Sequence, residues 1–258
     1  QGAWIALIFG GMLFTLVRFA EPIFVLFQVP DDVIVIAMAY LSAASWGLPA
    51  VVLYVTLRYA CEGLGQTVLP MLIAGSTLPV NAVLNYVLIY GVFGLPELGG
   101  EGCGWATAIT MWFELSVMLL VIKRPWLLDT GLLDRFDWPR FDPMSSIFRV
   151  GVPIGLTLFL EMTVFALISL LVGSIGVTAI GANTIAGNLN WFVFVIPMSL
   201  GSAASIRVGC YVGAKDYQAA AQVARLTIFV SATYAFLAFA VLILGRDDLP
   251  KIYSSDAE

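Results

Sequence analysis

The side chains able to do chemistry are few, and most lie inside long apolar stretches. Glu161 comes twelve residues after Arg149, within a stretch rich in Leu, Val, Ile and Phe. On a helix rising about 1.5 Å per residue, Glu161 would lie about 18 Å into a bilayer, close to its midplane. A charge there costs about 2.5–3.5 kcal/mol, and residues kept at that cost are usually functional. We therefore predict that Glu161 binds a proton or a cation; the alternative is a protonated structural carboxyl.

Glu114 is a second acid in an apolar stretch, nine residues before Lys123. Its neighbours Trp112 and Phe113 leave open whether it faces lipid headgroups, a cavity or another helix. We keep it as a candidate cavity residue, beside the alternative of a purely structural role.

Amide side chains form two further groups at membrane depth. Asn81 and Asn85 are four residues apart and so share one helical face. Such amides either hold helices together or line an aqueous cavity, and we favour the cavity. A similar polar strip contains Asn183, Asn188 and Asn190, and it precedes aromatic residues that include Phe194. An aromatic ring can stack on a cationic ligand, although most rings in such a chain pack or lie at the interface.

Other kinds of chemistry lack their residues in this sequence. Histidine is absent, which removes the commonest general base and metal ligand. Cys61, Cys103 and Cys210 lie far apart with no metal-ligand spacing, so we expect them to pack as small apolar residues. No apolar stretch holds paired carboxylates. We therefore expect no enzyme, no cofactor, no nucleic-acid partner, and no metal beyond a possible Na⁺ at Glu161.

The elements that position these residues must be helices in a membrane. The 258 residues are 60% hydrophobic and 11% charged, whereas soluble domains carry about 25% charged residues. Lipid leaves the edges of an open sheet unpaired, so we predict an all-α, polytopic membrane protein. Seven stretches are long enough to span about 30 Å of hydrocarbon. They cover residues 3–27, 33–59, 67–92, 103–122, 148–172, 177–206 and 219–244.

The connections between these stretches alternate in charge. One set is acidic, and the other holds nine of the twelve basic residues: Arg58, Lys123, Arg124, Arg135, Arg140, Arg149, Arg207, Lys215 and Arg225. The positive-inside rule places the basic set in the cytoplasm, so the first helix runs outward and the chain ends outside. One long polar connection separates the apolar stretch 103–122 from the stretch 148–172. It divides the chain into one lobe over 1–124, a cytoplasmic inter-lobe loop over 125–147, and a second lobe over 148–258.

Four strings of residues resemble the NorM branch of the multidrug and toxic compound extrusion (MATE) transporters. The most specific is the run NAVLNYVLIYGVFGLPELGGEGCGWATAI, at residues 81–109. The others are EGLGQTVLPM at 62–71, GVPIGLTLFLE at 151–161 and PMSLGSAASIRVG at 197–209. The resemblance covers essentially the whole chain. It implies a two-lobe exporter of twelve helices, of which this chain would supply the third to the ninth.

The resemblance also implies a function. Such proteins exchange Na⁺ or H⁺ for cationic, amphiphilic drugs across the inner membrane, and we expect a monomer in contact with lipid. Glu161 matches the intramembrane glutamate of the family's seventh helix. Asn85 stands where some relatives place an Asp, and Asn183 where several place a His. The carboxylates of the first and tenth helices would lie outside these residues, and we expect the chain to be a fragment.

Three other functions fit the sequence less well than export of cations. A flippase of lipid-linked substrates in a related fold would need basic residues in its cavity for a phosphate, and the spans offer few. An intramembrane enzyme would need a nucleophile and a base or a bound metal. A structural scaffold would not need Glu161 at the midplane.

Overall fold

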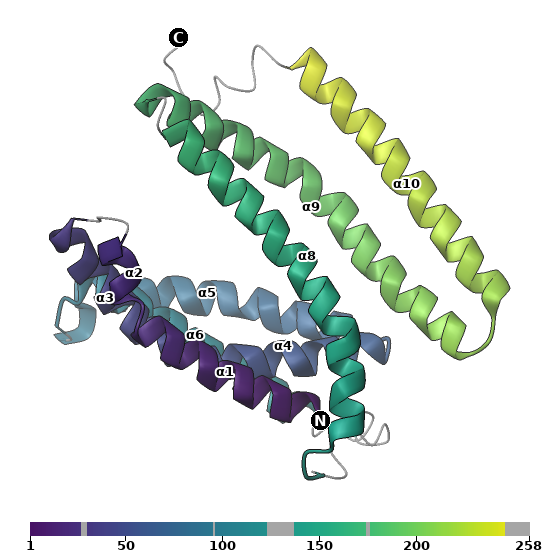
Figure 1. The fold of residues 1–258 in the computed structure, drawn as a ribbon, viewed down its shortest axis with the longest axis horizontal. Helices are drawn as coiled ribbons and strands as arrows, with labels where there is room; N and C mark the ends of the chain where they lie inside the picture. Colours follow the sequence, from purple (N-terminus) through teal and green to yellow (C-terminus); the bar gives the residue numbers. More distant parts are fainter. Residues whose placement is uncertain (27–29, 95, 123–136, 174–175, 246–258) are drawn as a thin grey trace. The chain divides into compact units, whose positions relative to one another are not determined.

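A computed structural model of the chain describes residues 1–26, 30–94, 96–122, 137–173 and 176–245. Regular structure in this described part is helical throughout (Figure 1). By their internal contacts the residues form two units, Gln1–Phe148 and Arg149–Glu258. Each unit is considered by itself.

The first unit contains six α-helices and one short 3₁₀ helix among its described residues. They are α1 (Gly2–Arg18), α2 (Glu21–Leu26), α3 (Asp31–Ser45), α4 (Leu48–Gly63), α5 (Val68–Tyr90), η1 (Val92–Gly94) and α6 (Gly99–Ile122). Helix α6 packs against α3, α4 and α5, and α1 packs against α4 and α3. The unit is therefore arranged around α6.

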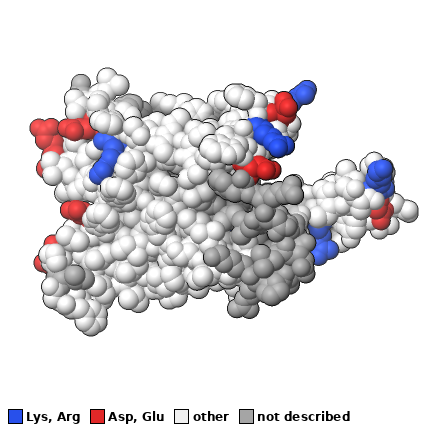
Figure 2. Space-filling view, turned by 90° about the horizontal axis from the view of Figure 1, so that it is seen from below, with Lys and Arg blue, Asp and Glu red and all other residues white. Residues whose placement is uncertain are grey.

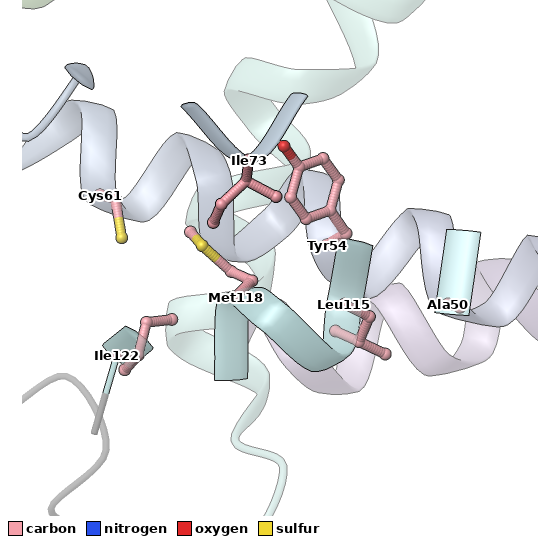
Figure 3. Close-up of a cluster of buried hydrophobic side chains, with 7 residues drawn as sticks. All are labelled: Ala50, Tyr54, Cys61, Ile73, Leu115, Met118 and Ile122. Carbon is pink, nitrogen blue, oxygen red and sulfur yellow. The ribbon is translucent and has the colours of Figure 1, made fainter. Parts of the chain in front are cut away.

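Apolar side chains fill the space between α4, α5 and α6. They are Ala50, Tyr54, Cys61, Ile73, Leu115, Met118 and Ile122 (Figure 3). Cys61 is fully buried, as expected for a cysteine that packs as a small apolar residue.

Small residues on α6 let its neighbours approach closely. A Cβ atom added at Gly104 would lie 2.5 Å from the carbonyl oxygen of Tyr40 on α3. One added at Gly102 would lie 2.5 Å from the carbonyl oxygen of Leu88 on α5. In lipid, helices associate through such close packing, because lipid tails are as apolar as the helices themselves.

Two of the predicted spans are interrupted. The helix expected over 3–27 is two helices, α1 and α2, with a break at Phe19 and Ala20. Pro22 explains the break, because it has no N–H to donate to the carbonyl four residues earlier, at Arg18. The span expected over 33–59 is the pair α3 and α4, bent by 50°. There Pro49 likewise removes the hydrogen bond to Ser45.

The second unit is built on three long helices. Helix α8 (Phe141–Gly173) starts in the first unit, and α9 (Val177–Gly213) and α10 (Tyr217–Leu244) follow it. Helices α9 and α10 pack side by side, joined by a turn of three residues (Figure 1). The Asp216 side chain in that turn accepts a hydrogen bond from the backbone N–H of Ala219 and caps α10. Apart from Ala220, the described side chains on these helices are exposed or half-buried.

Helix α8 begins earlier than the expected span of 148–172. Pro143 lies in its first turn, where proline is tolerated because the first N–H groups of a helix have no partner within it. The preceding residues contact α1: Trp4 Nε1 donates to Asp137 O at 3.0 Å, and Gln1 Nε2 donates to Trp138 O at 3.0 Å. Most of the predicted inter-lobe loop lies outside the described residues.

The helices have the length and composition of membrane spans. Five of those described are long and apolar enough to cross a bilayer, namely α5, α6, α8, α9 and α10, and the bent pair of α3 and α4 adds a sixth. Helix α1 is shorter, with 17 residues. On the face shown in Figure 2, charged side chains gather toward two sides of the view, with a wide uncharged surface between them. The prediction of an all-α membrane protein is confirmed.

Candidate functional site

A row of polar side chains lies between α5 and α6, inside the apolar first unit. We call it the polar seam: Thr77, Asn81 and Asn85 on α5, with Thr110 and Glu114 on α6. The α5 residues are spaced at i, i+4 and i+8, and the α6 residues at i and i+4. Each set therefore lies along one face of its helix, and the two faces meet where α5 packs on α6.

Hydrogen bonds join three residues of the seam, Asn85, Asn81 and Thr110. Asn85 Nδ2 donates to Asn81 Oδ1 at 2.8 Å, and Asn81 Nδ2 donates to Thr110 Oγ1 at 3.1 Å. Thr110 Oγ1 in turn donates to the carbonyl oxygen of Ala106 at 2.7 Å. Asn81 therefore ties α5 to α6, and Asn85 is bonded to Asn81 on the same helix. Holding helices together is one of the two roles that the sequence suggests for these amides.

This series of hydrogen bonds leaves one buried side-chain oxygen without a donor among the described residues. Asn85 Oδ1 is buried and has no hydrogen-bond partner among the described residues. A buried acceptor without a donor costs about 1–3 kcal/mol. An amide oxygen is a good ligand for a hard cation such as Na⁺, so the seam also offers a binding group.

Glu114 lies at the other end of the seam. Its Oε1 atom is 3.1 Å from Thr77 Oγ1 on α5. Tyr54 on α4 is 3% exposed, and its hydroxyl has no partner among the described residues, yet it lies close enough to Glu114 to interact with it electrostatically. Glu114 thus faces neighbouring helices, one of the three alternatives left open by the sequence.

An ion pair lies further along α4. Arg58 Nε donates to Glu62 Oε1 at 2.7 Å, and Glu62 is 8% exposed. Spaced at i and i+4, the two charges largely neutralise one another. Arg58 is therefore not a free cation for an anionic ligand.

Sequence reasoning missed three residues of this region: Tyr54, Thr77 and Thr110. The signal for the threonines was present, because Thr77 extends the spacing of Asn81 and Asn85 by one turn, and Thr110 precedes Glu114 by one turn. Tyr54 had no such signal, since its electrostatic interaction with Glu114 depends on how α4 packs against α6.

The remaining candidates belong to the second unit. Glu161 lies well inside α8, and its side chain is exposed. On α9, Asn183 is half-buried, Asn188 is exposed and Phe194 is 43% exposed. No hydrogen bond among the described residues joins these four side chains. The roles predicted for them therefore stay predictions.

Comparison with known proteins identifies the class of this helical membrane protein. The MatE family model matches residues 1–87 and 153–258. The multidrug resistance protein PmpM of Pseudomonas aeruginosa is 35% identical over 258 residues, which is 99% of this chain and 54% of PmpM. A probable multidrug resistance protein NorM of Idiomarina loihiensis is 35% identical over 232 residues, covering 90% of this chain and 50% of NorM.

Solved structures show the same fold. A crystal structure of the eukaryotic MATE transporter AtDTX14 superposes with a TM-score of 0.81 at 21% identity, covering 99% of this chain and 56% of that protein. A MATE protein in complex with MaD5 also gives a TM-score of 0.81, at 18% identity and with 98% and 57% coverage.

The chain therefore belongs to the MatE family, a family of transporters and not of enzymes. The resemblance to MATE proteins of the NorM type is confirmed. The chain spans about half the length of the curated relatives that it matches.

Proposed function

We propose that the complete protein exports amphiphilic organic cations across the inner membrane, in exchange for Na⁺ or H⁺. The observation that carries the proposal is the polar seam, a hydrogen-bonded row in an apolar bundle whose buried Asn85 Oδ1 has no partner among the described residues. A buried oxygen without a donor costs about 1–3 kcal/mol, a cost that a bound cation would remove. The names of the relatives, multidrug resistance proteins, support export of drugs.

The coupling ion, in this proposal, binds at Glu161. A carboxyl placed well inside the apolar helix α8 is costly to ionise, so it holds either a proton or a cation that compensates its charge. Both Na⁺ and H⁺ meet this requirement, and no cofactor is needed.

Cargo would bind in competition with that ion. One acid in a poorly solvated cavity selects positive charge, because Coulomb attraction is stronger there than in water. Asn183, Asn188 and Phe194 on α9 would supply polar contacts and a ring face to cations of varied shape. Transport follows if the ion and the cargo favour different states of two lobes that rock about the cavity.

The charge pattern gives the proposed orientation. The turn between α9 and α10 carries Lys215 and lies beside Arg207 and Arg225, which places it in the cytoplasm under the positive-inside rule. Helix α1 then starts in the cytoplasm and the chain ends outside. We propose a monomer, since each predicted site lies within one chain.

A flippase of lipid-linked substrates remains the second candidate. It would need free basic residues in the spans to hold a phosphate. The described helices hold five basic residues. Arg58 is paired with Glu62, and the others lie toward helix ends: Arg18 is the last residue of α1, and Arg149, Arg207 and Arg225 lie within about nine residues of an end of α8, α9 and α10. This distribution favours cations as cargo.

The test is ion-driven dye efflux by the complete protein in proteoliposomes. Glu161→Gln keeps the size of the side chain and removes its charge, so we expect efflux of a cationic dye to fall at least tenfold. Glu97→Gln, which neutralises an exposed acid outside the helices, is the matched control and should transport normally. Efflux by Glu161→Gln at the control rate would sink the proposed role of Glu161.

A further inference from the structure

The hydroxyl of Thr77 makes two contacts with oxygen atoms. Thr77 Oγ1 is 2.6 Å from the carbonyl oxygen of Ala74 and 3.1 Å from Glu114 Oε1. A hydroxyl has one proton to donate and two lone pairs with which to accept. A backbone carbonyl can only accept, and the shorter distance is that of a strong O–H···O hydrogen bond. The proton of Thr77 is therefore used on Ala74.

The contact between Thr77 and Glu114 then needs a proton from the other side. Two oxygen atoms at 3.1 Å with no proton between them would repel, and more strongly if the carboxylate were charged. A protonated Glu114 removes the conflict, because its carboxyl O–H can donate to the free lone pair of Thr77 Oγ1. Thr77 is 6% exposed, so water does not easily replace this donor.

A second hydroxyl is available for the ionised form of Glu114. Tyr54 is 3% exposed, and its hydroxyl is buried without a partner among the described residues. It lies within electrostatic range of Glu114. Leaving a buried hydroxyl unpaired costs about 1–3 kcal/mol, a cost that disappears when a nearby carboxylate accepts from it.

Among the described residues, the helices that pack on α6 offer Glu114 no free positive charge. The one base on α4 is Arg58, which is bonded to Glu62 at 2.7 Å. Helix α5 contributes neutral side chains from Val68 to Asn85. The other titratable side chains of the helices that pack on α6 are Tyr59 and Cys61 on α4, Asp31, Asp32 and Tyr40 on α3, Tyr86 and Tyr90 on α5, with Glu101 and Cys103 on α6 itself.

We propose that Glu114 is a proton-binding carboxyl of the first unit, separate from Glu161 on α8. Protonated, it donates to Thr77 Oγ1. Ionised, it gives its proton to water that enters the protein, and it then accepts a hydrogen bond from the Tyr54 hydroxyl. Its contribution to transport rests on the proposed ion-coupled export, whereas its protonation does not depend on that function.

The test uses infrared difference spectroscopy on the complete protein in lipid, titrated with pH. We expect a carbonyl stretching band of a protonated carboxylic acid that is lost in Glu114→Gln and retained in Glu161→Gln. A band unchanged in Glu114→Gln would overturn the proposal. Because the readout is spectroscopic, it stands even if Glu161→Gln transports at the control rate.

Two further variants should shift the midpoint pH of this band in opposite directions. Thr77→Val removes the acceptor of the protonated form, so the midpoint should move to lower pH. Tyr54→Phe removes the donor to the ionised form, so the midpoint should move to higher pH. The Tyr54→Phe shift should be about one to two pH units, the size of one hydrogen bond to a charged group. The Thr77→Val shift should be smaller, about half a unit to one unit, because that bond joins two neutral groups.

Thr77→Ser keeps the hydroxyl and should restore the midpoint of the unaltered protein. Thr77→Ser also controls for damage to the fold. A Thr77→Val protein that failed to assemble would give no titration curve, whereas Thr77→Ser should give the curve of the unaltered protein. A shift of Thr77→Val to higher pH would show that Thr77 donates to an ionised Glu114, and would contradict the proposal.

Discussion

At the scale of single residues, the polar seam combines stability and binding in the same side chains. Asn81 holds α5 to α6 by donating to Thr110 at 3.1 Å, and it accepts from Asn85 on its own helix at 2.8 Å. Asn85 makes one of these bonds, and no donor in the described part of the chain reaches its own oxygen. The two asparagines are therefore not equivalent, although they look alike in sequence: Asn81 is the structural member, and Asn85 the one with a free ligand atom.

This difference predicts separable effects of two substitutions. Asn81→Ala should lower the stability of the complete protein by about 1–2 kcal/mol, because it removes one hydrogen bond between α5 and α6 and one within α5, both in an apolar setting. Asn85→Ala should cost less, because it removes one donated bond and also the unpaired oxygen. Thermal unfolding in detergent measures both, and equal losses of stability would contradict the distinction.

At the scale of elements, the first unit depends on how closely α3 and α5 approach α6. Gly104 contacts the backbone of α3, and Gly102 contacts that of α5. The bend between α3 and α4 also lies against α6, since a Cβ atom at Gly47 would lie 2.9 Å from Ala108 Cα. The seam residues meet at hydrogen-bonding distance because this glycine- and alanine-rich face of α6 permits it.

We therefore expect Gly104→Ala to destabilise the protein by about 1–3 kcal/mol, the usual cost of overpacking. The new methyl group would meet the carbonyl oxygen of Tyr40, which cannot move without shifting α3. Gly75→Ala on α5 is the matched control, because a Cβ atom there has no neighbour within 4 Å. Thermal unfolding should separate the two variants, and equal transition temperatures would rule out this role for Gly104.

At the scale of the whole molecule, basic and acidic connections alternate along the chain. The α9–α10 turn belongs to the basic set. Glu97, just before α6, and Glu101, in the first turn of α6, belong to the acidic set. Because basic connections stay in the cytoplasm, these two places should lie on opposite sides of the membrane.

Cysteine labelling tests this orientation in intact cells. After Cys61, Cys103 and Cys210 are replaced by Ala, single cysteines at Ala214 and Glu97 give two exposed reporters. A membrane-impermeant thiol reagent added outside should label the Glu97→Cys protein and not the Ala214→Cys protein, until the cells are opened. The reverse pattern would invert the topology.

Composition and periodicity alone determined the fold class and nearly all of the helices. A chain with 60% hydrophobic residues must satisfy its backbone within helices once it lies in lipid, so apolar length predicts the spans. The family resemblance lay in contiguous strings, and such strings can be read without a structure. Proline positions also marked the breaks at Pro22 and Pro49, although the prediction treated those spans as continuous.

The tertiary structure alone decided which polar residues meet. Asn81 and Asn85 were recognisable as one face, but their bond to Thr110 depends on the rotation of α6 against α5. The sequence left three possible surroundings for Glu114. The packing of α6 on α5 and α4 decided between them, because it lets Glu114 interact with Thr77 and Tyr54. The spacing of residues along the sequence fixes which of them share a face of one helix. Which other helix packs on that face depends on close packing at small residues such as Gly102 and Gly104. This packing joins segments that lie apart in the chain, so the spacing within one segment does not reveal it.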